Sequence, residues 1–247
     1  IPLVNKSSSE IGVNSLIERK SGEVLVGTSG MGLYSVHYKD NRVSAVHKNY
    51  SFIKLDNTIS FLHEDKAGNL WIVTSNQGVI RLNKNNRYNV FAINKMTKDV
   101  IYNDICEDAR GNVYLGILNE GLYVFRPNSS CFVSAITSSQ SDIAISALSV
   151  ANNHEIYVGT DNEGLKIYDT VTGRITDSGI NPTTFDFGKA KIHSMIKDRQ
   201  GNFWLGLYQK GVLFLPVNTN KFNYIGYKSV AKNMIGSNAV MSIHKDH

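Results

Sequence analysis

The sequence predicts an all-β protein made of repeated four-stranded antiparallel units, and three observations lead to this prediction. Tyr, Phe, Asn, Ser and Thr are frequent and there are 20 glycines, a composition that favours strands and turns over helices. A nine-residue pattern, Asp-x-x-Gly-Asn followed by an aromatic residue and aliphatic residues, recurs along the chain, as in DRQGNFWLG at 198–206. The copies are spaced by 43 to 47 residues, which is typical of one blade of a β-propeller.

Each copy divides into four expected strands. An apolar stretch such as 59–63 forms the innermost strand, and the Asp-x-x-Gly-Asn turn leads into a second strand that carries the aromatic residue, such as Trp71. A Gly-containing turn then leads to a third strand, and a weaker fourth strand follows, as in RYNVFAI at 87–93. We predict blades at approximately 11–52, 53–96, 97–140, 141–186 and 187–232, with the start of a further blade at 233–247.

The aromatic residue of each second strand is expected to pack between adjacent blades, so that Trp71 and Trp204 belong to the core. Cys106 is placed on an innermost strand and Cys131 on an outermost strand of the same unit. Three strand spacings correspond to roughly 14 Å, which is beyond the reach of a disulfide. We therefore expect two free, buried thiols.

Charge and hydropathy narrow the class of protein. The net charge is +5, and residues 181–247 hold nine Lys and Arg against three Asp and Glu. The basic residues are scattered among turns without interleaved stacking aromatics, so no nucleic acid is expected as a partner. The sequence has no apolar run long enough to span a bilayer, and its first residues, IPLVNKSSSE, do not read as a signal peptide.

The repeat resembles the two-component regulator propeller found in the periplasmic sensor region of hybrid histidine kinase/response regulator proteins of Bacteroides-type bacteria. The resemblance rests on EDKAGNLWIVTSNQGVIRL at 64–82, EDARGNVYLGILNEGLYVF at 107–125 and KDRQGNFWLGLYQKGVLFL at 197–215. It implies a seven-bladed propeller, of which five to six blades are present here, and an oligosaccharide ligand that regulates polysaccharide-utilisation genes. It also implies other propeller and immunoglobulin-like domains as partners, homodimerisation of the parent protein, and phosphorelay by parts outside this chain.

Three copies depart from the pattern. The first has Arg19 where Asp is usual, the second has Val73 where Gly is usual, and the fourth has Asn153, His154 and Glu155 in place of the Gly-Asn turn. We interpret these changes as the ordinary divergence of blades that share only their packing.

Candidate ligand-binding residues lie in the turns between second and third strands, where the copies differ most. Amide, carboxylate and aromatic groups there suit hydrogen bonds to sugar hydroxyls and stacking on a sugar ring, although Asn, Asp and Gly also simply make turns. His193 is added because it lies on an innermost strand. The candidates are Asn76, Gln77, Asn119, Glu120, Asp161, Asn162, His193, Tyr208, Gln209 and Lys210. The basic C-terminal quarter favours an acidic oligosaccharide.

Catalytic residues, a metal site and a cofactor are not predicted, since the seven His residues form no convergent set and no phosphate-binding Gly-rich loop is present. Two alternatives to the sensor remain open. One is a structural or protein-interaction propeller without its own ligand, and the other is a lyase of the streptogramin type that would use His193.

Overall fold

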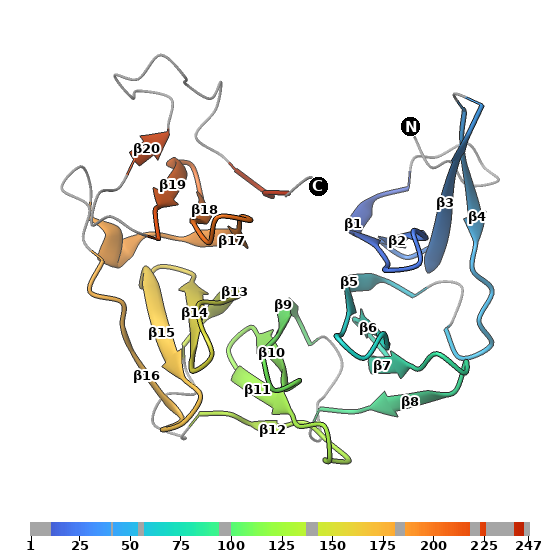
Figure 1. Ribbon diagram of the computed structural model, residues 1–247, viewed down its shortest axis with the longest axis horizontal. Coiled ribbons are helices and arrows are strands. Elements are labelled where there is room, and N and C mark those ends of the chain that lie inside the picture. Colours follow the sequence, from blue (N-terminus) through green and yellow to red (C-terminus); the bar gives the residue numbers. More distant parts are fainter. Residues whose placement is uncertain are drawn as a thin grey trace. The chain divides into compact units, whose positions relative to one another are not determined.

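The computed structural model describes residues 11–40, 42–53, 57–93, 100–136, 143–180, 186–217, 223–225 and 240–244. These residues form five sheets, each of four antiparallel strands hydrogen-bonded in the order of the chain, which confirms the predicted all-β propeller class (Figure 1). Each sheet is called a blade below. By its contacts the chain divides into two compact units, one made of 1–102 with 125–133 and the other of 103–124 with 134–247.

The strands follow the predicted order in every blade. The first blade contains β1 (Val13–Glu18), β2 (Val24–Thr28), β3 (Leu33–Lys39) and β4 (Arg42–His47); the second contains β5 (Ile59–Glu64), β6 (Leu70–Thr74), β7 (Gly78–Leu82) and β8 (Tyr88–Phe91). The third contains β9 (Tyr102–Glu107), β10 (Val113–Ile117), β11 (Gly121–Phe125) and β12 (Val133–Ser134); the fourth contains β13 (Ile145–Val150), β14 (Glu155–Thr160), β15 (Leu165–Asp169) and β16 (Arg174–Asp177). A short 3₁₀ helix, η2 (Phe187–Lys189), precedes the fifth blade of β17 (Ile192–Lys197), β18 (Phe203–Leu207), β19 (Gly211–Leu215) and β20 (Asn223–Ile225).

The Asp that recurs in the repeat organises the turn between the first and second strands of its blade. The carboxylate of Asp65 accepts hydrogen bonds from the backbone N–H of Asn69 at 2.7 Å, from the Asn69 side chain at 2.8 Å and from the indole N–H of Trp71 at 2.9 Å. Gly68 supplies the positive φ, 82°, that the turn requires. The same arrangement recurs around Asp108 with Tyr114 and around Asp198 with Trp204. The repeated pattern therefore encodes a turn that satisfies a buried aromatic donor.

Aromatic packing follows the prediction, with one difference. Trp71 is buried, and its ring lies 5.2 Å from that of Phe125 and 5.9 Å from that of Phe132, both in the same unit. The guanidinium of Arg81 lies over the Trp71 and Phe125 rings at 5.6 and 5.2 Å. Trp204 is only half-buried among the described residues.

Glycine in the second strand of a blade makes room for the next innermost strand. A Cβ atom added at Gly116 would lie 2.7 Å from Cγ2 of Ile145, which is fully buried. The pairs Gly27 with Ile59 and Gly159 with Ile192 repeat this contact. The contact differs between the second and third blades. Val73 of β6 replaces the glycine, and Tyr102 of β9 replaces the isoleucine.

The other departures also have local explanations. Arg19, which replaces Asp in the first copy, forms an ion pair with Glu64 of the next blade at 3.2 Å. In the fourth copy the Asn152 side chain donates to the Glu155 carboxylate at 2.6 Å and holds the turn instead. The expectation for the cysteines is half correct: both thiols are free, but Cys131 is exposed and precedes the outer strand β12 instead of lying in it.

Candidate functional site

A β-bulge in the innermost strand determines where the candidate histidine points. The pairing of β17 with β18 shifts between Ile192 and Ser194, so His193 is the extra residue of the bulge. The innermost strands of the first, second and fourth blades are bulged at the equivalent place, at Asn14, Ser60 and Ser146. A bulge turns its extra side chain away from the alternation of the strand, so these side chains are aimed by the backbone.

In the first, third and fourth blades the residue at this place donates a hydrogen bond to the neighbouring blade. The Asn14 side chain donates to the carbonyl of Ile59 at 3.2 Å, and Ser146 donates to the carbonyl of Ile192. Asn103, at the same position of β9, donates to the carbonyl of Ile145 at 2.6 Å. His193 makes no such bond to the described residues; its imidazole is exposed and lies against the ring of Tyr208.

The turn between the second and third strands meets the residue that precedes the innermost strand. The backbone N–H of Tyr208 donates to the carbonyl of Lys191 at 2.9 Å, and that of Asp161 donates to the carbonyl of Ala144 at 2.8 Å. Equivalent bonds join Ser29 with Gly12 and Ser75 with Thr58. This bond brings the variable turn of each blade next to the start of the innermost strand.

Two side-chain pairs of the second unit are joined here by this backbone bond, and we call them the His193 cluster: Asp161 with Lys191, and His193 with Tyr208. The ring centroids of His193 and Tyr208 are 5.1 Å apart with an interplanar angle of 38°. Lys191 Nζ lies 2.9 Å from the Asp161 carboxylate, and their backbones form an isolated β-bridge between the fourth and fifth blades. All four side chains are partly exposed, Tyr208 to 39%. The cluster thus offers aromatic surface, an ammonium and a carboxylate to a ligand.

The turn residues beside the cluster have a conformational role. Asn162 and Gln209 adopt positive φ values of 98° and 55°, and Asn119 of the third blade does so at 59°. Asn tolerates this left-handed region better than most residues, which accounts for its use in two of these turns. The side chains of Asn162, Gln209, Lys210 and Glu120 are exposed.

Two of the predicted ligand residues, Asn76 and Gln77, lie in the first unit, whereas the His193 cluster lies in the second. The Gln77 amide accepts a hydrogen bond from Asn57 and donates to the carbonyl of Phe52 at 3.3 Å, so it anchors a neighbouring segment. Asn76 precedes it in the same exposed turn.

Lys191 is the residue that sequence reasoning missed. It directly precedes the innermost strand β17 and lies outside the turns from which the candidates were chosen. Its position in the repeat could have identified it. In four blades the carbonyl of the equivalent residue accepts a hydrogen bond from the first residue of the turn between the second and third strands.

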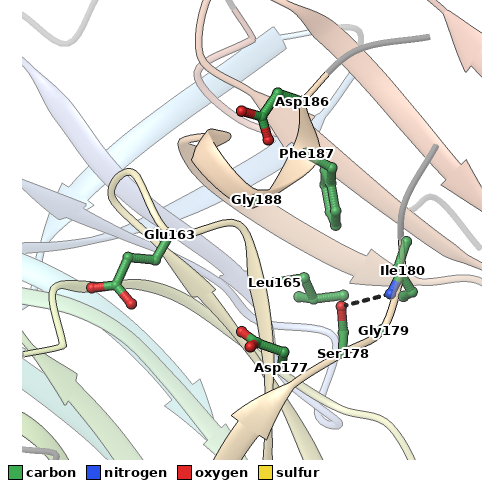
Figure 2. A pocket seen from close by; sticks show the side chains of 9 residues that line it. All are labelled: Glu163, Leu165, Asp177, Ser178, Gly179, Ile180, Asp186, Phe187 and Gly188. Atoms are coloured by element: carbon green, nitrogen blue, oxygen red, sulfur yellow. Dashed lines mark hydrogen bonds between the residues drawn. The ribbon is translucent and has the colours of Figure 1, made fainter. Parts of the chain in front are cut away.

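A cavity of about 360 Å³ lies beside the turn at Asp161 to Gly164 (Figure 2). Its rim carries the carboxylates of Glu163, Asp177 and Asp186, and its lining includes Leu165 and Phe187. Lys166 Nζ lies 2.7 Å from the Asp177 carboxylate and 3.2 Å from that of Glu163. Burial disfavours the ammonium, but these two hydrogen bonds outweigh burial and raise the pKa of Lys166.

The described residues contain neither a group suited to hold a metal ion nor a helix suited to cross a membrane. Within the described ranges, groups of three or more His, Cys, Asp or Glu side chains that could hold a metal ion do not occur. In the same part of the chain, no helix has the length and apolarity that crossing a membrane requires.

Comparisons with solved structures find the same fold in sensors and in lyases. The chain is similar to the extracellular domain of the one-component system BT4673 of B. thetaiotaomicron, with 17% identity, a TM-score of 0.70 and coverage of 98% of this chain and 31% of that one. For the extracellular domain of the hybrid two-component system BT3049 of the same organism the values are 16%, 0.61, 96% and 38%. For virginiamycin B lyase of Staphylococcus aureus, in a structure with quinupristin, they are 11%, 0.68, 93% and 73%.

The chain spans about a third of the length of the two sensor domains. A comparison with curated protein sequences finds no match. The family model described as SMP-30/gluconolactonase/LRE-like region matches residues 35–215, which is most of the chain and covers the His193 cluster. The chain therefore belongs to the SMP-30/gluconolactonase/LRE-like family of β-propellers.

Proposed function

We propose that this chain is the ligand-binding part of an extracytoplasmic sensor of the hybrid two-component type, that it lies in the periplasm, and that its ligand is an oligosaccharide bound at the His193 cluster. The ligand would act through other domains of a longer protein, which forms a homodimer and passes the signal by phosphorelay. The chain itself performs no reaction in this proposal.

One observation carries the placement of the site. The side chains at the bulge position of other blades are used to join neighbouring blades, as Asn14 and Asn103 are. His193 occupies this position but is exposed beside Tyr208. Among the described residues, His193 contacts the Tyr208 ring where three other blades have a hydrogen bond to the next blade. This difference supports a ligand-binding role for His193 and Tyr208.

The chemistry of the cluster suits a sugar. The partly exposed Tyr208 ring offers apolar surface to the C–H face of a pyranose, while the imidazole of His193 and the groups of Asp161 and Lys191 can bond the hydroxyls at its edge. The amides of Asn162 and Gln209 lie on the same two turns and add further donors and acceptors. The fold shared with sensor domains of B. thetaiotaomicron supports the sensor class.

Calorimetric titration of the chain with a collection of plant and host oligosaccharides tests the proposal. We expect binding of at least one member, and a loss of affinity of about tenfold or more in Tyr208→Ala and in His193→Ala, which corresponds to about 1.4 kcal/mol or more. Tyr38→Ala is the matched control, because Tyr38 is 71% exposed on β3 of the other unit. Binding that survives both cluster variants would contradict the site.

A lyase is the second candidate, and the exposure of His193 is the observation that favours it, since an accessible imidazole can serve as a general base. Incubation with streptogramin B antibiotics distinguishes the two functions. Linearised product that disappears in His193→Ala would establish the lyase and contradict the sensor as the primary role. If neither ligand binding nor turnover occurs, the structural or protein-interaction propeller is the remaining function.

A further inference from the structure

The ion pair in the His193 cluster is built so that its two members can separate. The Lys191 ammonium and the Asp161 carboxylate are 2.9 Å apart, and their side chains are 44% and 45% exposed. An exposed ion pair of this kind contributes about 0 to 1 kcal/mol to stability. Replacing Asp161 by another anion as the partner of Lys191 therefore costs little.

The backbone holds Lys191 in place while its side chain exchanges partners. Its carbonyl accepts from the N–H of Tyr208 at 2.9 Å, and the neighbouring Ala190 carbonyl accepts from the N–H of Gly164 at 3.1 Å. These bonds fix the start of β17 against both turns. The backbone of Lys191 is thus held next to that of Tyr208, so a ligand that stacks on the Tyr208 ring would lie near the residue that carries the ammonium.

One of the two acids beside the cluster is paired with a lysine outside it. The two turns at 160–164 and 207–211 and the stretch 190–193 contain two lysines, Lys191 and Lys210, and two acids, Asp161 and Glu163. Glu163 does not oppose Lys191, because its carboxylate lies 3.2 Å from Lys166 at the rim of the neighbouring cavity (Figure 2). Asp161 is thus the acid of these segments that is paired with Lys191.

We infer that the His193 cluster recognises an anionic substituent of its ligand, a carboxylate or a sulfate group on a sugar, through Lys191, and that Asp161 occupies Lys191 until the ligand replaces it. This inference rests on the proposed oligosaccharide-binding function and names the class of ligand. Asp161 acts in it as an internal competitor, and Lys191 is the residue that determines specificity for charge.

Matched pairs of oligosaccharides test the inference by calorimetric titration of the chain. One arm compares uronate-containing oligosaccharides with their carboxyl-reduced forms, and the other compares sulfated oligosaccharides with their desulfated forms. We expect at least about tenfold tighter binding of the charged member in one arm, which also identifies the substituent. Lys191→Met should remove this preference, so that the charged and the neutral member bind with equal affinity.

The variant Asp161→Asn separates competition from simple attraction. It removes the competing charge and keeps the size of the side chain, so affinity for the charged member should rise by up to about fivefold, as expected for loss of an exposed ion pair. Affinity for the neutral member should not rise. Lys166→Met is the control, because Lys166 pairs with Glu163 and Asp177 instead, and it should leave the preference intact.

The outcomes distinguish failure of the inference from failure of the proposed function. Equal binding of charged and neutral members, or a preference that persists in Lys191→Met, would overturn the inference and leave oligosaccharide binding in place. Weaker binding of the charged member by Asp161→Asn would overturn the role of Asp161 as competitor. Absence of binding in every pair would overturn the proposed function and the inference together.

Discussion

The ring centroids of His193 and Tyr208 lie 5.1 Å apart, although His193 belongs to β17 and Tyr208 to the turn after β18, 15 residues further along the sequence. The β-bulge of β17 aims His193, and the hydrogen bond from the N–H of Tyr208 to the carbonyl of Lys191 places the turn beside it. The ring pair is therefore a product of backbone geometry that every blade shares, combined with side chains that only the fifth blade carries.

Backbone strain in the turn that carries Tyr208 should disorganise the ring pair without unfolding the blade. Replacing Gln209, whose φ is 55°, by Gly relieves the turn, whereas Gln209→Val strains it. We expect Gln209→Val to destabilise the chain by about 1 to 2 kcal/mol and to weaken ligand binding, and Gln209→Gly to change both little. Urea denaturation together with titration checks this, and equal effects of the two variants would show that the conformation of the turn does not matter.

Asp65, the Asp of the second repeat copy, is a buried turn residue that should be sensitive to substitution. Asp65→Ala leaves the buried indole N–H of Trp71 and the N–H of Asn69 without their acceptor. The expected loss of stability is about 2 to 4 kcal/mol in chemical denaturation, from several lost hydrogen bonds and a buried unsatisfied donor. Asp186→Ala, at an exposed position, serves as the control. A loss below that of the control would show that the turn hydrogen bonds are dispensable.

Arg81 should stabilise the aromatic cluster of the first unit through its charge. Its guanidinium lies 5.2 to 5.7 Å from the ring centroids of Trp71, Phe91 and Phe125. Arg81→Met keeps most of the side-chain length and removes the cation, and we expect a loss of about 1 to 2 kcal/mol. The exposed Arg87→Met is the comparison. Thermal unfolding monitored by Trp fluorescence measures both, and an unchanged midpoint for Arg81→Met would exclude a cation–π contribution.

Stability should fall as the pH rises through neutrality because of Asp104. Burial raises the pKa of this carboxyl from 3.8 to about 7, while hydrogen bonds from the N–H groups of Leu148 and Ile105 oppose the rise. The folded chain therefore holds a proton that the unfolded chain has lost, so the favourable contribution is complete below about pH 4 and is lost as the pH passes 7. Its full size is at most about 4 kcal/mol, at about 1.4 kcal/mol for each pKa unit.

The variant Asp104→Asn isolates this group, since it keeps an acceptor for Leu148 and cannot ionise. The difference in unfolding free energy between the variant and the parent chain should shift in favour of the variant between pH 4 and pH 8. A difference that is independent of pH would show that Asp104 does not titrate in this range.

The repeat made the fold predictable, and the limits of prediction are visible at single residues. Aligning the copies located the strands because Asp, Gly and the aromatic residue each perform a packing task that recurs in every blade. The same alignment suggested Gln77 as a candidate ligand residue, because it lies in a turn where the copies differ. Gln77 proved to anchor Asn57, a partner 20 residues away that no local pattern identifies.

Lys191 could not be recognised from its neighbours in the sequence, because its partner Asp161 belongs to the preceding blade. Cys131 was expected to lie buried on an outermost strand, but it is exposed and lies two residues before β12, because the weak pattern of the fourth strand does not mark where that strand begins. The inferred preference of the cluster for an anion likewise depends on the ion pair between Glu163 and Lys166, which is a matter of side-chain geometry.

A crystal structure of the chain with a bound oligosaccharide, chosen as the tightest binder in the titrations, tests the central claim most directly. We expect a sugar ring in van der Waals contact with Tyr208, a hydroxyl or anionic group within hydrogen-bond distance of Lys191 Nζ, and the ammonium displaced from Asp161. A sugar bound elsewhere, for example in the cavity lined by Glu163 and Asp177, with the His193 cluster unchanged, would contradict the account.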